Sequence, residues 1–277
     1  MGVRAGEERM TRLGLHHLTA LDVSPIELVT VAEAVGCQEV CLFTHCPPTA
    51  APFPVLRPRD ARELSRRLDG AAISVASIEF FPLEERPPFE LYLRGIELGA
   101  AIGGRRIVTH VFDFDRARAM DNFCKLCGMA AEHGLEVGLE FMALSPAMNS
   151  LGKAIDFVAN SGRRNAAVAI DILHLMRSGG TVAEVETLSA DQISYVQICD
   201  GPSTMPVEFQ LPEAAGERMI PGQGEFPLVK FVGALPVGVA MDVEVPLKAM
   251  TESGVAGLER AKLAVDATRR ILAAAGR

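Results

Sequence analysis

The stretch AAVAIDIL, residues 166–173, is an almost uninterrupted apolar run with one carboxylate in its second half. Continuous apolar runs of this length are typical of parallel β-strands that are buried on both faces. Similar segments recur along the chain, and a longer amphipathic segment separates each from the next. They lie at residues 13–18, 39–44, 72–80, 105–112, 136–141, 194–200 and 237–245. The sequence therefore predicts eight buried strands.

Helix signals fill the gaps between these strands. Ser24 followed by Pro25 is a helix start signal, and Gly134 ends the helix that we expect over residues 116–133. Strand and helix alternating eight times within 277 residues predict an α/β protein with a single (β/α)8 TIM barrel. An open doubly wound sheet is the alternative, but no G-x-G-x-x-G follows the first strand. We expect a loose tail over residues 1–11 and the barrel over residues 12–277.

Composition excludes several classes of function. The net charge of -8 argues against nucleic acid as a partner, because phosphate binding needs clustered Lys and Arg. No apolar run approaches the roughly 18 residues that cross a membrane, and we expect no secretory signal because the first residues have no apolar core. Most of the six cysteines lie inside apolar segments, as is typical of a reducing compartment. We expect a cytoplasmic protein that handles small molecules.

Polar side chains gather at the ends of the expected strands, where TIM-barrel enzymes keep their chemistry. Five of the six histidines lie at or just beyond such an end: His16, His17, His45, His110 and His174. Carboxylate or amide side chains hold the same position on five of the strands: Glu79, Glu140, Asp171, Gln197 and Glu244. A carboxylate in an apolar strand is costly unless it is paired or binds a metal.

The last four of these residues come from consecutive strands and should converge at one end of a barrel. Three carboxylates and one amide offer only oxygen atoms, which suit one divalent ion such as Mn²⁺, Mg²⁺ or Co²⁺, with Zn²⁺ as a less favoured choice. Strand capping or salt bridging could explain any one of the four, but it explains all four together less well.

Several short motifs resemble the xylose isomerase-like TIM-barrel superfamily over residues 13–275. They are GLE at strand five, D-x-x-H as Asp171 and His174, Q-x-x-D as Gln197 and Asp200, Arg218 with PGQGEFP, and DVE at strand eight. The superfamily holds sugar isomerases and epimerases, inosose and 3-dehydroshikimate dehydratases, and endonuclease IV. The resemblance implies that one metal is bound by Glu140, Asp171, Gln197 and Glu244. Its members more often have His at the place of Gln197, and Asp200 is expected to orient the Gln197 amide.

The resemblance implies a divalent-metal-dependent isomerase or epimerase of a keto-sugar or polyol-like carbonyl compound. Proton transfer would pass through a metal-bound enediolate, with Glu140 and Glu244 as the acid and base. His174 would assist catalysis, and the substrate would be contacted by Arg218, Glu79, His110 and His45. Glu79 has an equal alternative, a salt bridge to Arg105 or Arg106.

Two other functions stay open. One is a metal-dependent dehydratase of the 3-dehydroshikimate or inosose type, in which His174, His110 or His45 would protonate the leaving hydroxyl. The other is a non-catalytic barrel that binds a metabolite. Endonuclease IV is disfavoured because no histidine lies between Gln197 and Glu244. The resemblance also allows a homo-oligomer.

Overall fold

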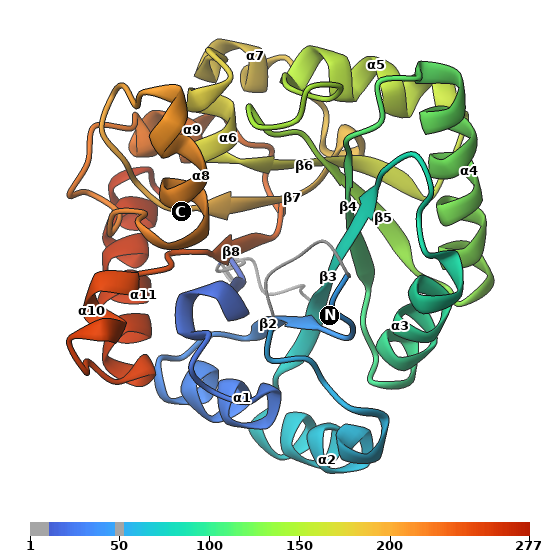
Figure 1. Ribbon diagram of the computed structural model, residues 1–277. Helices are drawn as coiled ribbons and strands as arrows, with labels where there is room; N and C mark the ends of the chain where they lie inside the picture. Colours follow the sequence, from blue (N-terminus) through green and yellow to red (C-terminus); the bar gives the residue numbers. More distant parts are fainter. Residues whose placement is uncertain (1–10, 48–52) are drawn as a thin grey trace, which may run out of the picture.

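The computed structural model describes residues 11–47 and 53–277, and it forms a closed barrel of parallel strands inside a ring of helices (Figure 1). Each strand pairs with the next along the chain, and β8 pairs with β1 to close the barrel. The predicted (β/α)8 TIM barrel is therefore confirmed. The strands are β1 (Leu13–His16), β2 (Glu39–Phe43), β3 (Ser74–Leu83), β4 (Arg106–Val111), β5 (Glu136–Glu140), β6 (Ala166–Asp171), β7 (Ile193–Ile198) and β8 (Met241–Val243).

Helices connect the strands and cover the outside of the barrel (Figure 1). The connections after β6, β7 and β8 each hold two helices within the described residues, and the sequence predicted only one in each place. The helices are α1 (Pro25–Ala34), α2 (Ala61–Ala71), α3 (Phe89–Ala101), α4 (Arg116–Glu132), α5 (Leu151–Ser161), α6 (Ile172–Arg177), α7 (Val182–Glu186), α8 (Val207–Gly216), α9 (Leu228–Ala234), α10 (Lys248–Glu252) and α11 (Gly257–Ala274). Short 3-10 turns are η1 (His17–Ala20), η2 (Pro58–Asp60) and η3 (Ala190–Gln192).

The helix starts follow from local sequence. Ser24 accepts a hydrogen bond from the Glu27 amide, and Glu27 accepts one from the Ser24 amide, which completes a capping box at α1. Asp115 caps α4 through the amides of Ala117 and Arg118. These caps satisfy amides that have no partner inside the helix, so they fix where each helix begins.

The barrel interior is polar, whereas the layer between strands and helices is apolar. The main hydrophobic core lies between the strands and the helices, where strand residues such as Leu42 and Ile107 and helix residues such as Phe123 are buried. Buried charged residues instead lie in the barrel interior near the amino-terminal ends of the strands, among them Arg106 and Asp242. An interior with this many polar groups gives the chain a buried site in which charges interact strongly.

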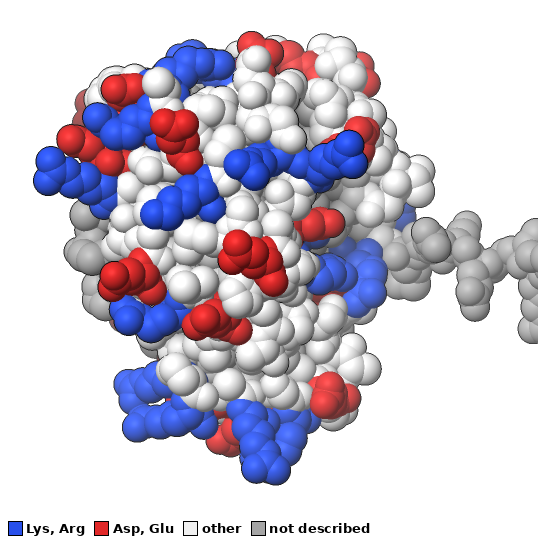
Figure 2. All heavy atoms as spheres, turned by 90° about the vertical axis from the view of Figure 1, so that its right-hand side faces the viewer, with Lys and Arg blue, Asp and Glu red and all other residues white. Residues whose placement is uncertain are grey.

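The surface carries charges of both signs. In Figure 2, basic and acidic side chains alternate over the face formed by the right-hand side of Figure 1. Across residues 11–47 and 53–277, no helix combines the length and the apolar character needed to cross a membrane. The tail predicted for residues 1–11 lies, apart from Thr11, outside the described residues.

Candidate metal centre and active site

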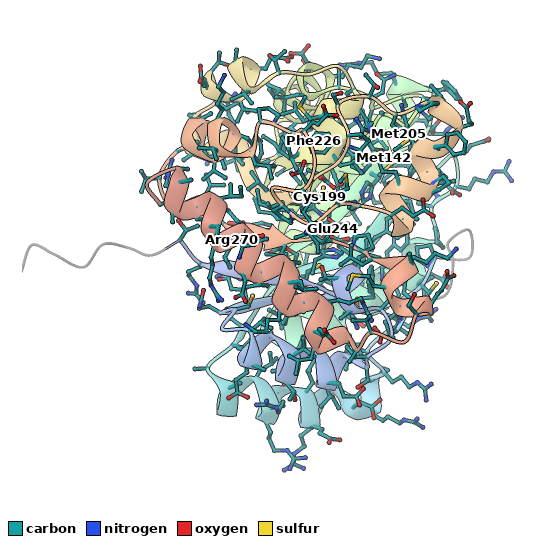
Figure 3. All side chains as sticks on the ribbon, turned by 90° about the vertical axis from the view of Figure 1, so that its left-hand side faces the viewer. Met142, Cys199, Met205, Phe226, Glu244 and Arg270 are labelled. Carbon is teal, nitrogen blue, oxygen red and sulfur yellow. The ribbon has the colours of Figure 1, made fainter. Side chains whose placement is uncertain are left out.

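The four predicted metal ligands lie together at the carboxyl ends of the last four strands. Glu140 ends β5 and Asp171 ends β6. Asp171 is the register partner of Gln197 on β7, and the Glu244 amide donates to the Ile198 carbonyl, which extends the pairing of β7 with β8. All four side chains are buried. In Figure 3, Glu244 lies in the middle of the barrel, behind the outer helix α11 that carries Arg270.

Arg218 joins two of these carboxylates. Its Nη1 donates to Asp171 Oδ2 at 2.6 Å, and its Nη2 donates to Glu244 Oε1 at 3.0 Å. Gln197 Nε2 donates to the other oxygen of Glu244. Two isolated bridges, between Asp200 and Met219 and between Glu217 and Leu247, fix the backbone on both sides of Arg218. Every guanidinium nitrogen of Arg218 has a protein acceptor, so its contact with substrate stays a prediction.

Two histidines lie beside Glu140. His110 Nε2 lies 3.0 Å from Glu140 Oε2, and His174 Nε2 lies 3.6 Å from Glu140 Oε1. Burial lowers the pKa of His174, although the charges of Asp171 and Glu140 act in the opposite direction. Glu140, Asp171 and His174 offer ligand atoms that all lie within 4.8 Å of one another.

The donor set fits a divalent cation. Glu140, Asp171 and Glu244 bring three negative charges, and Arg218 brings one positive charge, so two negative charges stay uncompensated if all three carboxylates are ionised. Burial raises the pKa of Glu244 to about 8, against the lowering effect of Arg218 and His16. Gln197 Oε1 is buried and has no hydrogen-bond partner. A hard divalent ion would satisfy the buried amide oxygen and the negative charge that remains in this group.

The predicted role of Asp200 is wrong. Its carboxylate makes no hydrogen bond to the Gln197 amide, which donates to Glu244 instead. Asp200 Oδ1 accepts from the amides of Gly201 and Phe226, and Oδ2 accepts from Gly222 and Gly224, at 2.8–3.0 Å. One buried carboxylate thus fixes the loop of the PGQGEFP motif. The sequence could not reveal this role, because three of the four amides meet Asp200 only after the loop folds back.

The predicted substrate contact of His45 is also wrong. His45 packs between Phe81 and Tyr92, with ring centroids at 4.4 Å and 5.3 Å, in the layer between the barrel and α3. A Cβ atom on Gly95 of α3 would lie 2.7 Å from His45 Nδ1. Strand β2 ends at Phe43, so the alternation that would turn His45 inward stops before it reaches that residue.

Glu79 belongs to a second buried group, and it pairs with neither Arg105 nor Arg106. His16 Nε2 lies 3.0 Å from Glu79 Oε1, and the Tyr195 hydroxyl donates to the same oxygen at 3.1 Å. His16, Cys41 and Glu79 also offer ligand atoms within 4.8 Å of one another. Cys41 and Tyr195 are not among the predicted site residues, although Tyr195 lies two residues before Gln197 and so faces the same way.

A β-bulge shapes this side of the barrel. Ile78 pairs with Ile107 and Phe81 with Thr109, so three steps along β3 match two along β4. Glu79 and the next residue, Phe80, therefore both turn toward the barrel interior. The peptide bond between them is cis.

Aromatic rings form a wall beside Glu79. The Phe43 and Phe53 rings stack at 4.3 Å, and the Phe53 and Phe80 rings meet edge to face at 6.0 Å. Phe80 in turn lies 5.2 Å from His110, and His110 lies 6.4 Å from Phe112. The wall thus runs from β2 to β4 and reaches the histidine that contacts Glu140.

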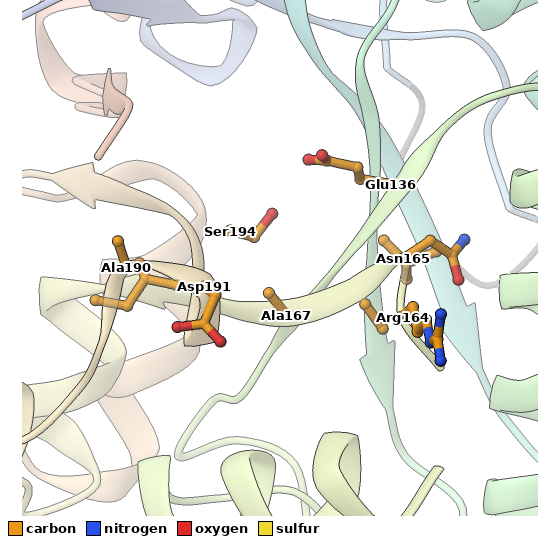
Figure 4. A pocket seen from close by; sticks show the side chains of 10 residues that line it. Glu136, Arg164, Asn165, Ala167, Ala190, Asp191 and Ser194 are labelled. Atoms are coloured by element: carbon orange, nitrogen blue, oxygen red, sulfur yellow. The ribbon is translucent and has the colours of Figure 1, made fainter. Parts of the chain in front are cut away.

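A surface pocket of about 270 Å³ lies at the opposite end of the barrel (Figure 4). Glu136, Asn165 and Ser194 line it, at or beside the first residues of β5, β6 and β7. The amino-terminal face of a TIM barrel contributes to stability, and catalysis takes place at the carboxyl-terminal face. The candidate active site is therefore the interior group around Glu140.

The family model of the xylose isomerase-like TIM barrel matches residues 29–261, which include all four strand-end oxygen donors. The chain belongs to the xylose isomerase-like TIM barrel family. This family membership confirms the resemblance that the motifs indicate. No curated protein matches the chain in sequence.

Several solved structures share the fold at low sequence identity. The chain is similar to an IolI protein with a binding zinc atom, at 16% identity and a TM-score of 0.76, over 95% of this chain and 98% of that one. A xylose isomerase domain protein from Alicyclobacillus acidocaldarius has 19% identity and a TM-score of 0.76, over 96% and 99%. A D-psicose 3-epimerase with D-tagatose, from Clostridium cellulolyticum H10, has 14% identity and a TM-score of 0.70, over 94% and 99%.

Proposed function

We propose that the chain is a divalent-metal-dependent isomerase or epimerase of a polyhydroxylated carbonyl compound. The observation that carries the proposal is the meeting of Glu140 and Glu244 in one buried group with surplus negative charge and an unpartnered amide oxygen. Structural relatives support it, because they include a D-psicose 3-epimerase and an L-ribulose 3-epimerase.

Each glutamate is prepared for a different part in proton transfer. A divalent ion bound by Glu140, Asp171, Gln197 and Glu244 would polarise the substrate carbonyl as a Lewis acid. Glu140, oriented by His110, takes the proton next to the carbonyl, and Glu244, oriented by Arg218, returns a proton from the opposite side. Arg218 also places positive charge where negative charge develops on the substrate oxygen. Burial keeps bulk water away from these groups and strengthens their interactions.

A dehydratase is the second candidate function. The contacts of His110 and His174 with Glu140 favour it, because elimination requires an acid next to the base. After the same proton abstraction, one histidine would protonate the leaving β-hydroxyl. The two candidates differ in product: an epimerase returns an isomer of equal mass, and a dehydratase releases one water.

Metal content tests both candidates. The chain is purified without chelator, and its bound metals are measured by inductively coupled plasma mass spectrometry. We expect about one equivalent of Mn, Co, Mg or Zn per chain, lost in Glu140→Ala and Asp171→Ala. Asp242→Asn is the matched control, since Asp242 is a buried carboxylate of β8 that is not a predicted ligand. No metal in the wild type, and none regained with Mn²⁺ or Mg²⁺, would leave the non-catalytic barrel as the remaining function.

Substrate screening then separates the two reactions. The metal-loaded chain is incubated with ketohexoses, inososes and 3-dehydroshikimate, and products are followed by mass spectrometry and NMR. When the reaction is run in deuterated water, an isomer with one deuterium at the α-carbon supports the epimerase. A product lighter by one water supports the dehydratase.

A further inference from the structure

Glu79 differs from the other interior carboxylates in how its two oxygens are used. His16 and Tyr195 approach the same atom, Oε1, from β1 and β7. Burial alone would raise the pKa of Glu79, but the charge of His16 and the hydrogen bonds from His16 and Tyr195 keep it low. His16 and Tyr195 thus both hold the carboxylate through one oxygen, and the Cys41 thiol also contacts this carboxylate.

Glu79 is also the member of this group that reaches the open side of the barrel. Its side chain is 6% exposed, whereas the side chain of His16 is completely buried. Phe80, which follows it, is half-buried and belongs to the aromatic wall. A molecule that enters the barrel mouth can therefore touch Glu79 and the wall, but it cannot touch His16.

The cationic groups on this side have protein partners. His16 contacts Glu79, and Arg106 donates to Ser77 and lies over the Tyr195 ring at 5.0 Å. Arg218 already joins Asp171 and Glu244. None of these three groups presents a donor to a phosphate or carboxylate at the barrel mouth. His16 is completely buried, Arg106 is buried at the first residue of β4 and so lies at the opposite end of the barrel, and every guanidinium nitrogen of Arg218 has a protein acceptor. A fixed carboxylate beside aromatic rings instead suits a hydroxyl donor with an apolar face.

From these contacts we infer that His16 and Tyr195 are positioning residues, which hold Glu79 as the acceptor for a hydroxyl at the uncharged end of the substrate. The aromatic wall of Phe43, Phe53 and Phe80 covers the carbon face of that same end. This inference rests on the proposed function and narrows its substrate class to neutral polyhydroxy carbonyl compounds. A phosphorylated end would place its negative charge against Glu79.

Binding and turnover of two probes test the inference. D-tagatose and D-tagatose 6-phosphate are titrated into the Mg²⁺-loaded chain, and Kd is measured by saturation-transfer NMR. We expect the free ketose to bind at least 10-fold more tightly than its phosphate. Tyr195→Phe and His16→Gln should each weaken ketose binding about 10-fold and raise KM by a similar factor, with kcat changed less than 3-fold. Glu79→Gln should reduce the preference for the uncharged probe.

Tyr92→Phe is the matched control. The Tyr92 hydroxyl is also buried and donates to the Pro82 carbonyl at 2.6 Å, but it lies outside the barrel. This variant should leave Kd and KM within 2-fold of the wild type. Equal or tighter binding of the phosphate, an unchanged Kd in Tyr195→Phe and His16→Gln, or no binding of either probe to the wild type would overturn the inference. Binding of D-tagatose without any turnover of ketoses would contradict the proposed reaction and leave the binding site standing.

Discussion

Arg218 Nη1 lies 2.6 Å from Asp171 Oδ2, although the two residues are 47 positions apart along the chain and the arginine belongs to a loop. The contact ties the segment after α8 to the end of β6 and leaves Nη2 free to hold Glu244. One guanidinium thus orders two of the four proposed metal ligands.

Replacement of Arg218 by lysine should show whether Arg218 acts through its positive charge alone or also through its two parallel donors. An ammonium group keeps the positive charge but cannot hold Asp171 and Glu244 with two parallel donors. We expect kcat/KM to fall by about 10²-fold, in line with the loss of a preorganised donor. Metal content, measured in the same preparation, should stay near that of the wild type. Wild-type activity in Arg218→Lys would contradict the role proposed for the planar guanidinium group.

Asp200→Asn should destabilise the chain without emptying the metal site. The amide group of Asn offers one acceptor oxygen, whereas Asp200 accepts four amide hydrogen bonds with two. Bonds to a charged group contribute about 1.5–3 kcal/mol each, so we expect a loss of about 2 kcal/mol or more in urea unfolding. Gln197→Ala is the comparison: it should lose metal with little change in stability. Loss of metal in Asp200→Asn would restore the role that the sequence predicted.

Glu213→Gln should be strongly destabilising. Arg177 and Glu213 form a buried pair with two contacts of 2.6 Å, which fastens α8 to the last residue of α6. Removal of one charge leaves the other buried and unpaired, at a cost of about 3–5 kcal/mol. The double variant Arg177→Met/Glu213→Leu should unfold at a higher urea concentration than either Arg177→Met or Glu213→Leu. Additive losses in this cycle would show that the two side chains are not coupled.

Stability should decrease as the pH falls from about 6.5 to 4, in part because of His17. Burial lowers the pKa of His17 to about 4, and its Nε2 lies 3.0 Å from the Val23 carbonyl. In the unfolded chain His17 has its ordinary pKa of 6.5, so between pH 6.5 and 4 it binds a proton that it does not bind in the folded chain. The stabilisation is therefore complete above pH 6.5 and is lost as the pH falls below it. The shift corresponds to about 3 kcal/mol. Urea unfolding of His17→Gln should show a correspondingly smaller decrease over this range, and an equal decrease in both proteins would contradict the assignment.

The strand-end residues are predictable from the sequence because two simple rules apply to them together. Parallel strands end on one side of a barrel, and alternation turns Tyr195 and Gln197 the same way. These two rules are enough to place the four oxygen donors of β5 to β8 at one end of the barrel. They fail for His45, because the sequence does not show that β2 stops at Phe43.

Contacts between distant segments explain the remaining errors. Helix α8 is not predictable from its local sequence, since Pro206 and Pro212 are poor helix formers and the helix is held by its tertiary pair between Glu213 and Arg177. The role of Asp200 depends in the same way on amides more than 20 residues away. Neither relationship leaves a local pattern in the chain.

The extra residue in β3 determines toward which face of the sheet each later side chain of that strand points. Deletion of one residue between Ile78 and Phe81 would restore regular pairing with β4 and leave a single side chain facing inward where Glu79 and Phe80 now both do. A family member without this residue would have to give up either the acidic or the aromatic side chain. The length of β3 is therefore as informative about what such a barrel accommodates as the identity of its residues.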